Sequence, residues 1–407
     1  MVENDKQHEH DTLVENLPVL NFLYNFNGFP RSILMRVVGL FLGIYILGLM
    51  LTSLDGSVNL GSKGLGYVQD VANSFFHISF IMSFYLIYRL GLKFSHLFDS
   101  ELKPALEVGA MHDVDIEASL RKWKGRINGT DPHAHRLIRI LHFTMGVCYC
   151  AFAIYLPIAT HQVEGNTWNF SFNPWTWTGP HPFGYFFNQA KDTFVFVILL
   201  PAALWQTALI ALATRQMVKE IAKHDRLKII PVFPDRAGGL SPLGQISLLL
   251  FYIVIVQLLH LLPTSIIYGM NWGYRIIYPL FFAFAVLVFF YPMKAARRPM
   301  KEAKRRELER IAVLIRQVYD ALKQPTDAIS TEQATKVEQI VALKELYRQT
   351  EGMPVWPYNF GTLAKFSTVF LIPVIVYLIQ VLATKDFIVG LCAQIWCMIR
   401  TMVNAPC

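Results

Sequence analysis

The chain alternates long uncharged apolar runs with shorter basic segments, and seven runs are long enough to cross a bilayer. A helix needs roughly 20 mostly apolar residues to span a hydrocarbon core of about 30 Å. The runs are continuous rather than alternating, which favours helices over barrel strands. The predicted spans are residues 37–54, 71–88, 140–160, 193–214, about 245–266 within 243–274, 276–293 and 366–384.

The predicted fold is therefore an all-α polytopic membrane protein with about seven transmembrane helices and a cytoplasmic antiparallel helical hairpin. Short polar and basic segments separate its parts. The predicted parts are an N-terminal segment (1–36), a six-helix transmembrane region (37–293) with inner loops 89–139 and 215–244 and an aromatic outer loop 161–192, the hairpin (294–362), and a last transmembrane helix with an interfacial C-terminal segment (363–407).

The hairpin prediction depends on two apolar stripes at helical spacing. The first arm is expected to continue from the sixth span, and Pro325 breaks the helical pattern between the arms. The stripes either bury each other or build an interface between subunits, and both alternatives stay open at this point. Their members are Leu308, Ile311, Ile315, Val318 and Leu322 in the first arm, and Val337, Ile340, Val341 and Tyr347 in the second.

Composition agrees with a membrane protein and excludes several other classes. Hydrophobic residues make up 54% of the 407 residues and charged residues only 16%, with a mean hydropathy of +0.36. Soluble domains carry about 25% charged residues. A soluble enzyme, a disordered chain and a disulfide-stapled secreted module are therefore excluded.

The positions of the basic residues predict orientation and explain the net charge of +8. With the N-terminus inside, the four inner segments hold 32 of the 37 Lys and Arg residues, and the outer side holds five. Such an excess on one side is typical of the cytoplasmic face. We therefore expect a multi-pass inner-membrane protein with a cytoplasmic N-terminus, whose basic loops meet anionic headgroups rather than nucleic acid.

One segment before the fifth span combines a carboxylate, a guanidinium and two glycines. Gly238 and Gly239 permit positive φ angles, and backbone amides just before a helix can form an anion-binding nest. Arg236 would add charge, and Asp235 would hold Arg236 or cap the turn. The segment is either an anion or lipid-phosphate site or a rigid turn back into the membrane.

Two short motifs carry a family resemblance. Residues 234–240 read Pro-Asp-Arg-Ala-Gly-Gly-Leu, and residues 354–357 read Pro-Val-Trp-Pro before the last span. Together they resemble a family of uncharacterised bacterial multi-pass inner-membrane proteins with a His-Pro-Asp-x-x-Gly-Gly-Leu motif. Phe233 stands here in the histidine position, so no role of that histidine carries over. The resemblance implies a bacterial inner membrane and no particular activity.

Polar residues within the spans are candidates for a pore or polar path, because such residues are costly in lipid. Asp70, Asn73 and His77 are three and four residues apart, so they share one face of the second span. Gln257 and His260 lie in the fifth span. Hydrogen bonding between helices is the alternative explanation.

No catalytic residue, metal site or cofactor is predicted. His133 and His135 stand without further ligands nearby, and the five cysteines do not match zinc-site spacing. The favoured hypothesis is a channel-like or pore-forming homo-oligomer that passes ions. A scaffold or partner-gated effector, with a soluble partner at the hairpin (294–350), is the second hypothesis. A membrane-embedded enzyme acting on a lipid-linked substrate through Arg236, His133 and His135 is the third.

Overall fold

The computed structural model is helical throughout the part of the chain that it describes, with one isolated bridge between Leu106 and Leu227. The described residues are 33–60, 65–106, 114–127, 131–160, 179–224, 226–229, 235, 237–267, 272–323, 331–358 and 360–383. The predicted N-terminal segment up to residue 32, most of the predicted aromatic outer loop and the predicted interfacial C-terminal segment lie outside these residues.

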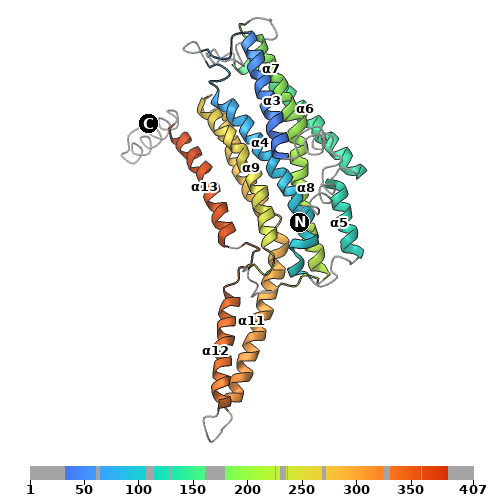
Figure 1. Ribbon diagram of the computed structural model, residues 1–407, viewed down its shortest axis with the longest axis vertical. Helices are drawn as coiled ribbons and strands as arrows, with labels where there is room; N and C mark the ends of the chain where they lie inside the picture. Colours follow the sequence, from blue (N-terminus) through green and yellow to red (C-terminus); the bar gives the residue numbers. More distant parts are fainter. Residues whose placement is uncertain are drawn as a thin grey trace, which may run out of the picture.

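Figure 1 shows the order of the helices along the chain. Two π-helical segments, η2 and η5, and a short 3₁₀ turn, η3, interrupt the α-helices. The elements are α3 (Ile33–Leu54), α4 (Val71–His96), η2 (Leu97–Glu101), η3 (Lys103–Ala105), α5 (Val114–Ile127), α6 (Pro132–Thr160), α7 (Pro182–Thr193), η5 (Phe194–Leu199), α8 (Leu200–Lys223), α9 (Ser241–Ile267), α10 (Trp272–Phe290), α11 (Lys294–Leu322), α12 (Thr331–Glu351) and α13 (Phe360–Ala383).

Five helical stretches in the described residues are long and apolar enough to cross a membrane, and six if α10 and α11 are counted as one bent span. The fold is thus compatible with an integral membrane protein. The predicted count of seven stays a prediction, because α6, which contains the predicted third span, is not among these stretches. The five are residues 33–54, 71–101, 182–223, 241–263 and 361–382.

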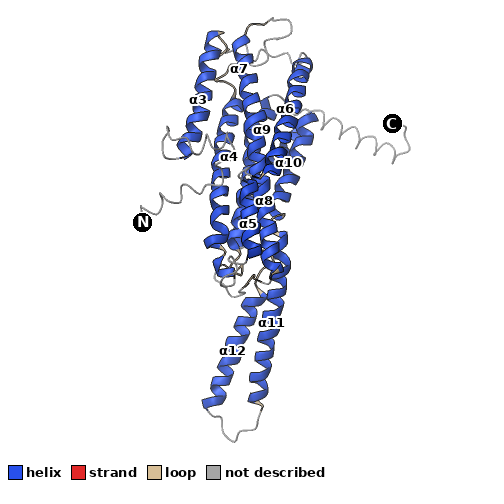
Figure 2. Cartoon of the chain, turned by 90° about the vertical axis from the view of Figure 1, so that its right-hand side faces the viewer, coloured by secondary structure: helices blue, strands red, loops and turns tan. Residues whose placement is uncertain are grey.

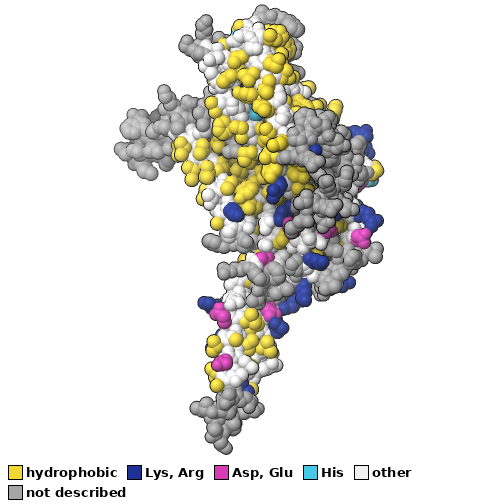
Figure 3. Space-filling view, viewed as in Figure 1, with side chains coloured by type: hydrophobic (Ala, Val, Ile, Leu, Met, Phe, Trp, Pro, Cys, Tyr) yellow, Lys and Arg dark blue, Asp and Glu magenta, His cyan; other side chains and the backbone are white. Residues whose placement is uncertain are grey.

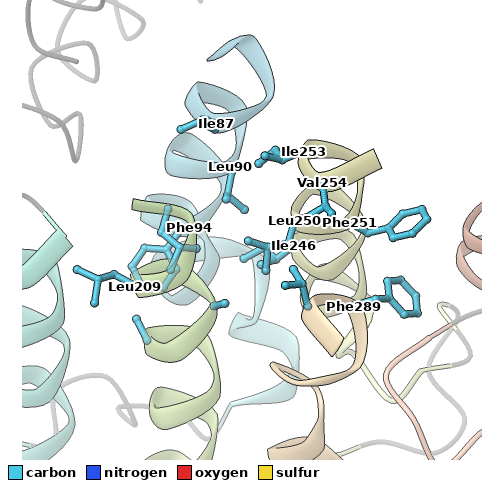
Figure 4. Packing of buried hydrophobic residues seen from close by; sticks show 14 of the residues in the cluster. Ile87, Leu90, Phe94, Leu209, Ile246, Leu250, Phe251, Ile253, Val254 and Phe289 are labelled. Carbon is cyan, nitrogen blue, oxygen red and sulfur yellow. The ribbon is translucent and has the colours of Figure 1, made fainter. Parts of the chain in front are cut away.

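The centre of the bundle is the packing of α4 against α9. Leu90 on α4 points toward Ile246 and Leu250 on α9, as Figure 4 shows. α3 and α8 also pack on α4, whereas α10 and α13 pack on α9. Burial of this continuous apolar core is what holds the helices in register.

The hairpin arms α11 and α12 lie side by side and project beyond the bundle (Figures 1 and 2). Leu308, Ile311 and Ile315 of the first stripe are buried or half-buried, whereas Val337 and Val341 of the second are exposed. α11 does not continue α10 directly, because the chain bends by 43° between them. Pro292 lies in the break, where its missing N–H interrupts the helical hydrogen bonds.

The fourth long helix begins earlier than expected. Residues 182–192, assigned to the outer loop, belong to α7, which runs through η5 into α8 as one 42-residue stretch. Pro182 occupies the first helical turn, where its fixed φ and missing N–H favour helix initiation. The apolar pattern begins only after Asp192, so hydropathy alone missed this polar first part of the helix.

Candidate functional site

The start of α4 brings three of the predicted path residues together. Asp70 is the N-cap, and its carboxylate accepts a hydrogen bond from the Asn73 backbone N–H at 3.1 Å. A carboxylate here satisfies a free amide and interacts favourably with the helix dipole. Asp70, Asn73 and His77 are all buried, at the end of the bundle remote from the hairpin (Figure 1).

A buried lysine on α7 completes this group. Lys191 Nζ donates to Asn73 Oδ1 at 2.9 Å and lies 3.6 Å from Asp192 Oδ1. It also lies 4.6 Å from the centre of the Phe76 ring. These partners offset the cost of placing an ammonium group in an apolar bundle. We call Asp70, Asn73, His77, Lys191 and Asp192 the α4 polar cluster.

The sequence pattern does not predict Lys191 as a site residue, because it places Lys191 in the outer loop before the fourth span. Two features of the sequence indicate a helix that contains Lys191, namely Pro182 and the four-residue spacing of Asn188 and Asp192. An amide and a carboxylate four residues apart meet on a helix, and Asn188 Nδ2 donates to Asp192 Oδ2 at 3.2 Å. A helix beginning at Pro182 would have placed Lys191 within the bundle.

His77 is enclosed by aromatic rings and makes no hydrogen bond within the described residues. The ring centres of Phe41, Tyr45 and Phe76 lie 6.2, 5.4 and 5.6 Å from its own, each nearly edge-on. Neither ring nitrogen of His77 has a hydrogen-bond partner among the described residues. Buried polar groups are nearly always hydrogen-bonded, so such groups call for a functional explanation.

Below His77, the same face of α4 becomes aromatic. Phe80 and Phe84 follow at helical spacing, and the Phe41 ring centre lies 6.0 Å from each of theirs. Farther along this face, Gly91 lies beside the Gln206 amide of α8, which is fully buried and has no described partner. Two polar regions with spare hydrogen-bonding capacity are thus separated by a phenylalanine layer.

Gln257, another predicted path residue, does not join the α4 polar cluster. Gln257 Nε2 donates to Ser83 Oγ, which ties α9 to α4 on a different face of α4 from His77. The His260 side chain lies outside the described residues. Gln257 therefore has the partner expected of a structural group, and the predicted role of His260 stays a prediction.

The glycine segment before α9 is organised by Asp235. Its Oδ1 accepts hydrogen bonds from the backbone N–H groups of Ala237 and Gly239 at 2.8 and 3.0 Å. Its Oδ2 accepts from the Ser241 N–H at 3.1 Å. Gly238 and Gly239 have φ angles of 67° and 85°, in the left-handed region that glycine adopts easily.

These contacts bear on the predicted anion or lipid-phosphate nest at Asp235, Arg236, Gly238 and Gly239. The amides that would hold an external anion instead bind the chain's own carboxylate, which favours the rigid turn. Arg236 lies outside the described residues. The external anion stays a prediction without support from these hydrogen bonds.

The start of α9, a few residues after the first motif, lies against the second motif. A Cβ atom on Gly244, at the start of α9, would lie 2.6 Å from the Pro357 carbonyl oxygen. Tyr358 follows and donates to the Phe289 carbonyl oxygen at 2.7 Å, and burial raises the pKa of Tyr358. We call the Asp235 loop together with Gly244 and residues 353–358 the Asp235 junction.

The remaining candidates are not gathered into a site. His133 is exposed, and its backbone N–H donates to Asp131 Oδ1 at 2.9 Å. The side chains of His135 and Arg236 lie outside the described residues. Within the described part of the chain, no group of three or more His, Cys, Asp or Glu side chains could hold a metal ion.

Comparisons with protein-family models, with curated proteins and with solved structures show no significant match to this chain.

Proposed function

We propose that the protein is an integral membrane protein that passes ions, and that the α4 polar cluster lines one end of the path. The unpartnered ring nitrogens of His77 carry this proposal. Their hydrogen-bonding capacity suits water or a hydrated ion passing through, because a purely structural cluster would pair its buried polar atoms.

The path would run within one chain rather than between subunits. Asn73 and His77 are buried among α3, α4 and α7 of the same molecule. Phe41, Phe80 and Phe84 would then form a closed hydrophobic gate between His77 and Gln206, since apolar constrictions block ions by excluding water. Assembly into a homo-oligomer is part of the proposal, as in multi-barrelled channels where each subunit conducts.

Ion flux from liposomes that contain the purified protein tests this proposal with two variants, one in the polar cluster and one in the gate. Replacing Lys191 by Met removes the buried charge, and we expect the flux to change by about tenfold or more, because a unit charge in the bundle acts at low dielectric. Replacing Phe80 by Ala shortens the gate, and we expect a higher flux. The matched controls are Lys344→Met, an exposed lysine on α12, and Phe251→Ala, a buried phenylalanine on α9.

Folding of each variant is checked by thermal unfolding in detergent. If Lys191→Met does not fold, His77→Phe replaces it, because His77 makes no hydrogen bond that the variant loses. Absence of flux from both the wild type and Phe80→Ala would contradict the proposal. Equal flux changes in Lys191→Met and Lys344→Met would contradict the role of the cluster.

The hairpin supports a second candidate, a scaffold or partner-gated effector that acts through the exposed side chains of α11 and α12. Val313, Val337 and Val341 are 55%, 52% and 63% exposed. An arm that projects from the bundle with uncovered apolar side chains fits a contact with a second copy or a soluble partner. Val337→Glu with Val341→Glu should then reduce the oligomeric mass measured by sedimentation in detergent, whereas Glu338→Gln should not.

A further inference from the structure

The base of the hairpin carries three exposed cations that the proposed ion path does not use. Lys294, Arg297 and Lys301 are three and four residues apart, so they share one face of α11. No described carboxylate lies within ion-pair distance of any of them. Three adjacent positive charges without an acidic partner favour a negatively charged ligand.

The neighbouring cations of α11 are already engaged within the chain. Arg298 pairs with Glu302 at 2.8 Å. Lys304 Nζ donates to the backbone carbonyl oxygens of Glu351 and Met353 at 2.6 and 2.9 Å. Lys294, Arg297 and Lys301 thus differ from Arg298 and Lys304, whose polar partners lie within the chain.

A tryptophan positions the central cation. The Arg297 guanidinium carbon lies 5.0 Å from the centre of the Trp356 ring. Stacking on an aromatic face fixes the guanidinium plane and leaves its N–H groups free at the edge, where they match two phosphate oxygens. Tryptophan itself prefers the headgroup level of a bilayer.

These residues lie where the membrane boundary is expected. The apolar helix α10 ends at Phe290, the basic α11 begins at Lys294, and Trp356 comes shortly before the apolar α13. On the neighbouring α8, Arg215 stacks on Tyr291 with its guanidinium carbon 4.3 Å from the ring centre. Figure 3 shows Lys and Arg side chains gathered around the level where the bundle gives way to the hairpin.

We propose that Lys294, Arg297 and Lys301 bind the phosphate group of an anionic lipid headgroup at the base of the hairpin. Arg297 would hold the phosphate through paired N–H groups, and the two lysines would supply charge on either side. Such a contact would hold the bend between α10 and α11 at the membrane surface. Nothing in this inference depends on ion conduction.

The test compares two triple variants with the same loss of charge from the same helix. Lys294→Gln, Arg297→Gln and Lys301→Gln remove the proposed site. Arg310→Gln, Arg316→Gln and Lys323→Gln remove three cations from the distal part of α11. Each full-length protein is placed in nanodiscs, and bound phosphatidylglycerol and phosphatidylcholine are counted by native mass spectrometry over a range of lipid fractions.

We expect the first variant to bind phosphatidylglycerol about 10- to 100-fold more weakly than the wild type, since each near-surface cation contributes on the order of 1 kcal/mol. The distal variant should match the wild type, and phosphatidylcholine should be held weakly by all three. Equal retention in both variants, or equal retention of both lipids by the wild type, would overturn the proposal.

Two further measurements distinguish lipid phosphate from free phosphate and cover the case in which the first variant does not fold. Inorganic phosphate at the same concentration should neither stabilise the wild type nor displace the lipid. If inorganic phosphate displaces the lipid, the site is not a lipid site. If the first variant does not fold, the wild type is titrated with salt. Phosphatidylglycerol binding must then weaken steeply, because salt screens exposed charges, and a flat response would refute the proposal.

Discussion

The α4 polar cluster and the Asp235 junction lie at opposite ends of the bundle (Figure 1), and both place an aspartate at the start of a long helix. At the junction, both oxygens of Asp235 accept backbone hydrogen bonds. In the cluster, both ring nitrogens of His77 lack hydrogen-bond partners among the described residues. Saturated hydrogen bonding indicates structure, and spare hydrogen-bonding capacity in an apolar bundle indicates function.

The largest effect that tests this comparison is the loss of Asp235. Asp235→Ala removes a carboxylate that holds three amide groups, and we expect it to lower the free energy of unfolding by about 2–4 kcal/mol. Thermal unfolding in detergent measures the change. Asp320→Ala, in an exposed pair with Arg316 at 3.8 Å, is the control and should change stability little. Similar effects of both variants would refute a structural role for Asp235.

Next in size is the contact between Gly244, at the start of α9, and Pro357 of the second motif. In Gly244→Ala, the added methyl group meets the Pro357 carbonyl oxygen, and one backbone must shift, at a cost of about 1–3 kcal/mol. Gly43→Ala is the matched control, because a Cβ atom there meets nothing within 4 Å. An unchanged unfolding temperature in Gly244→Ala would mean that the start of α9 does not pack on Pro357 as closely as described.

A smaller, pH-dependent effect is expected from Tyr358. Because burial raises its pKa, the folded protein binds the phenol proton more tightly than the unfolded chain does. Its contribution is therefore fully present below pH about 10 and is lost as the pH rises toward the raised value. Tyr358→Phe should flatten the alkaline fall in unfolding temperature, and Tyr319→Phe, at an exposed position, should leave the slope as it is.

The smallest effect on stability belongs to the cluster. His77→Phe loses no hydrogen bond and keeps an aromatic ring among Phe41, Tyr45 and Phe76, so we expect a change within about 1 kcal/mol. The same variant should alter ion flux. A large loss of stability would show that His77 has a structural partner and would remove the contrast between the two regions.

Much of the fold follows from local sequence pattern. The apolar runs mark most of the long helices, and the heptad-like spacing of Leu308, Ile311 and Ile315 marks the α11 face that packs in the hairpin. Helix starts were harder to place. α7 begins with a polar and aromatic stretch whose hydrophobicity resembles a loop, so its first residues were misassigned.

The candidate site was only half predictable. The spacing of Asp70, Asn73 and His77 correctly grouped three residues on α4, since helical periodicity is a local property. The same rule cannot say which helix faces them. It therefore included Gln257, which bonds Ser83 instead, and missed Lys191, which is 118 residues from its partner Asn73.

The sequence by itself determined the helical class and the apolar character of the long helices, because hydropathy and helical period are read from neighbouring residues. Only the tertiary structure decided which polar groups find partners. Asp235 fills its own nest of amides, Gly244 meets Pro357, and Lys191 reaches Asn73, whereas His77 has no hydrogen-bond partner among the described residues. Whether a buried polar atom is satisfied depends on distances across the fold, which no local pattern contains.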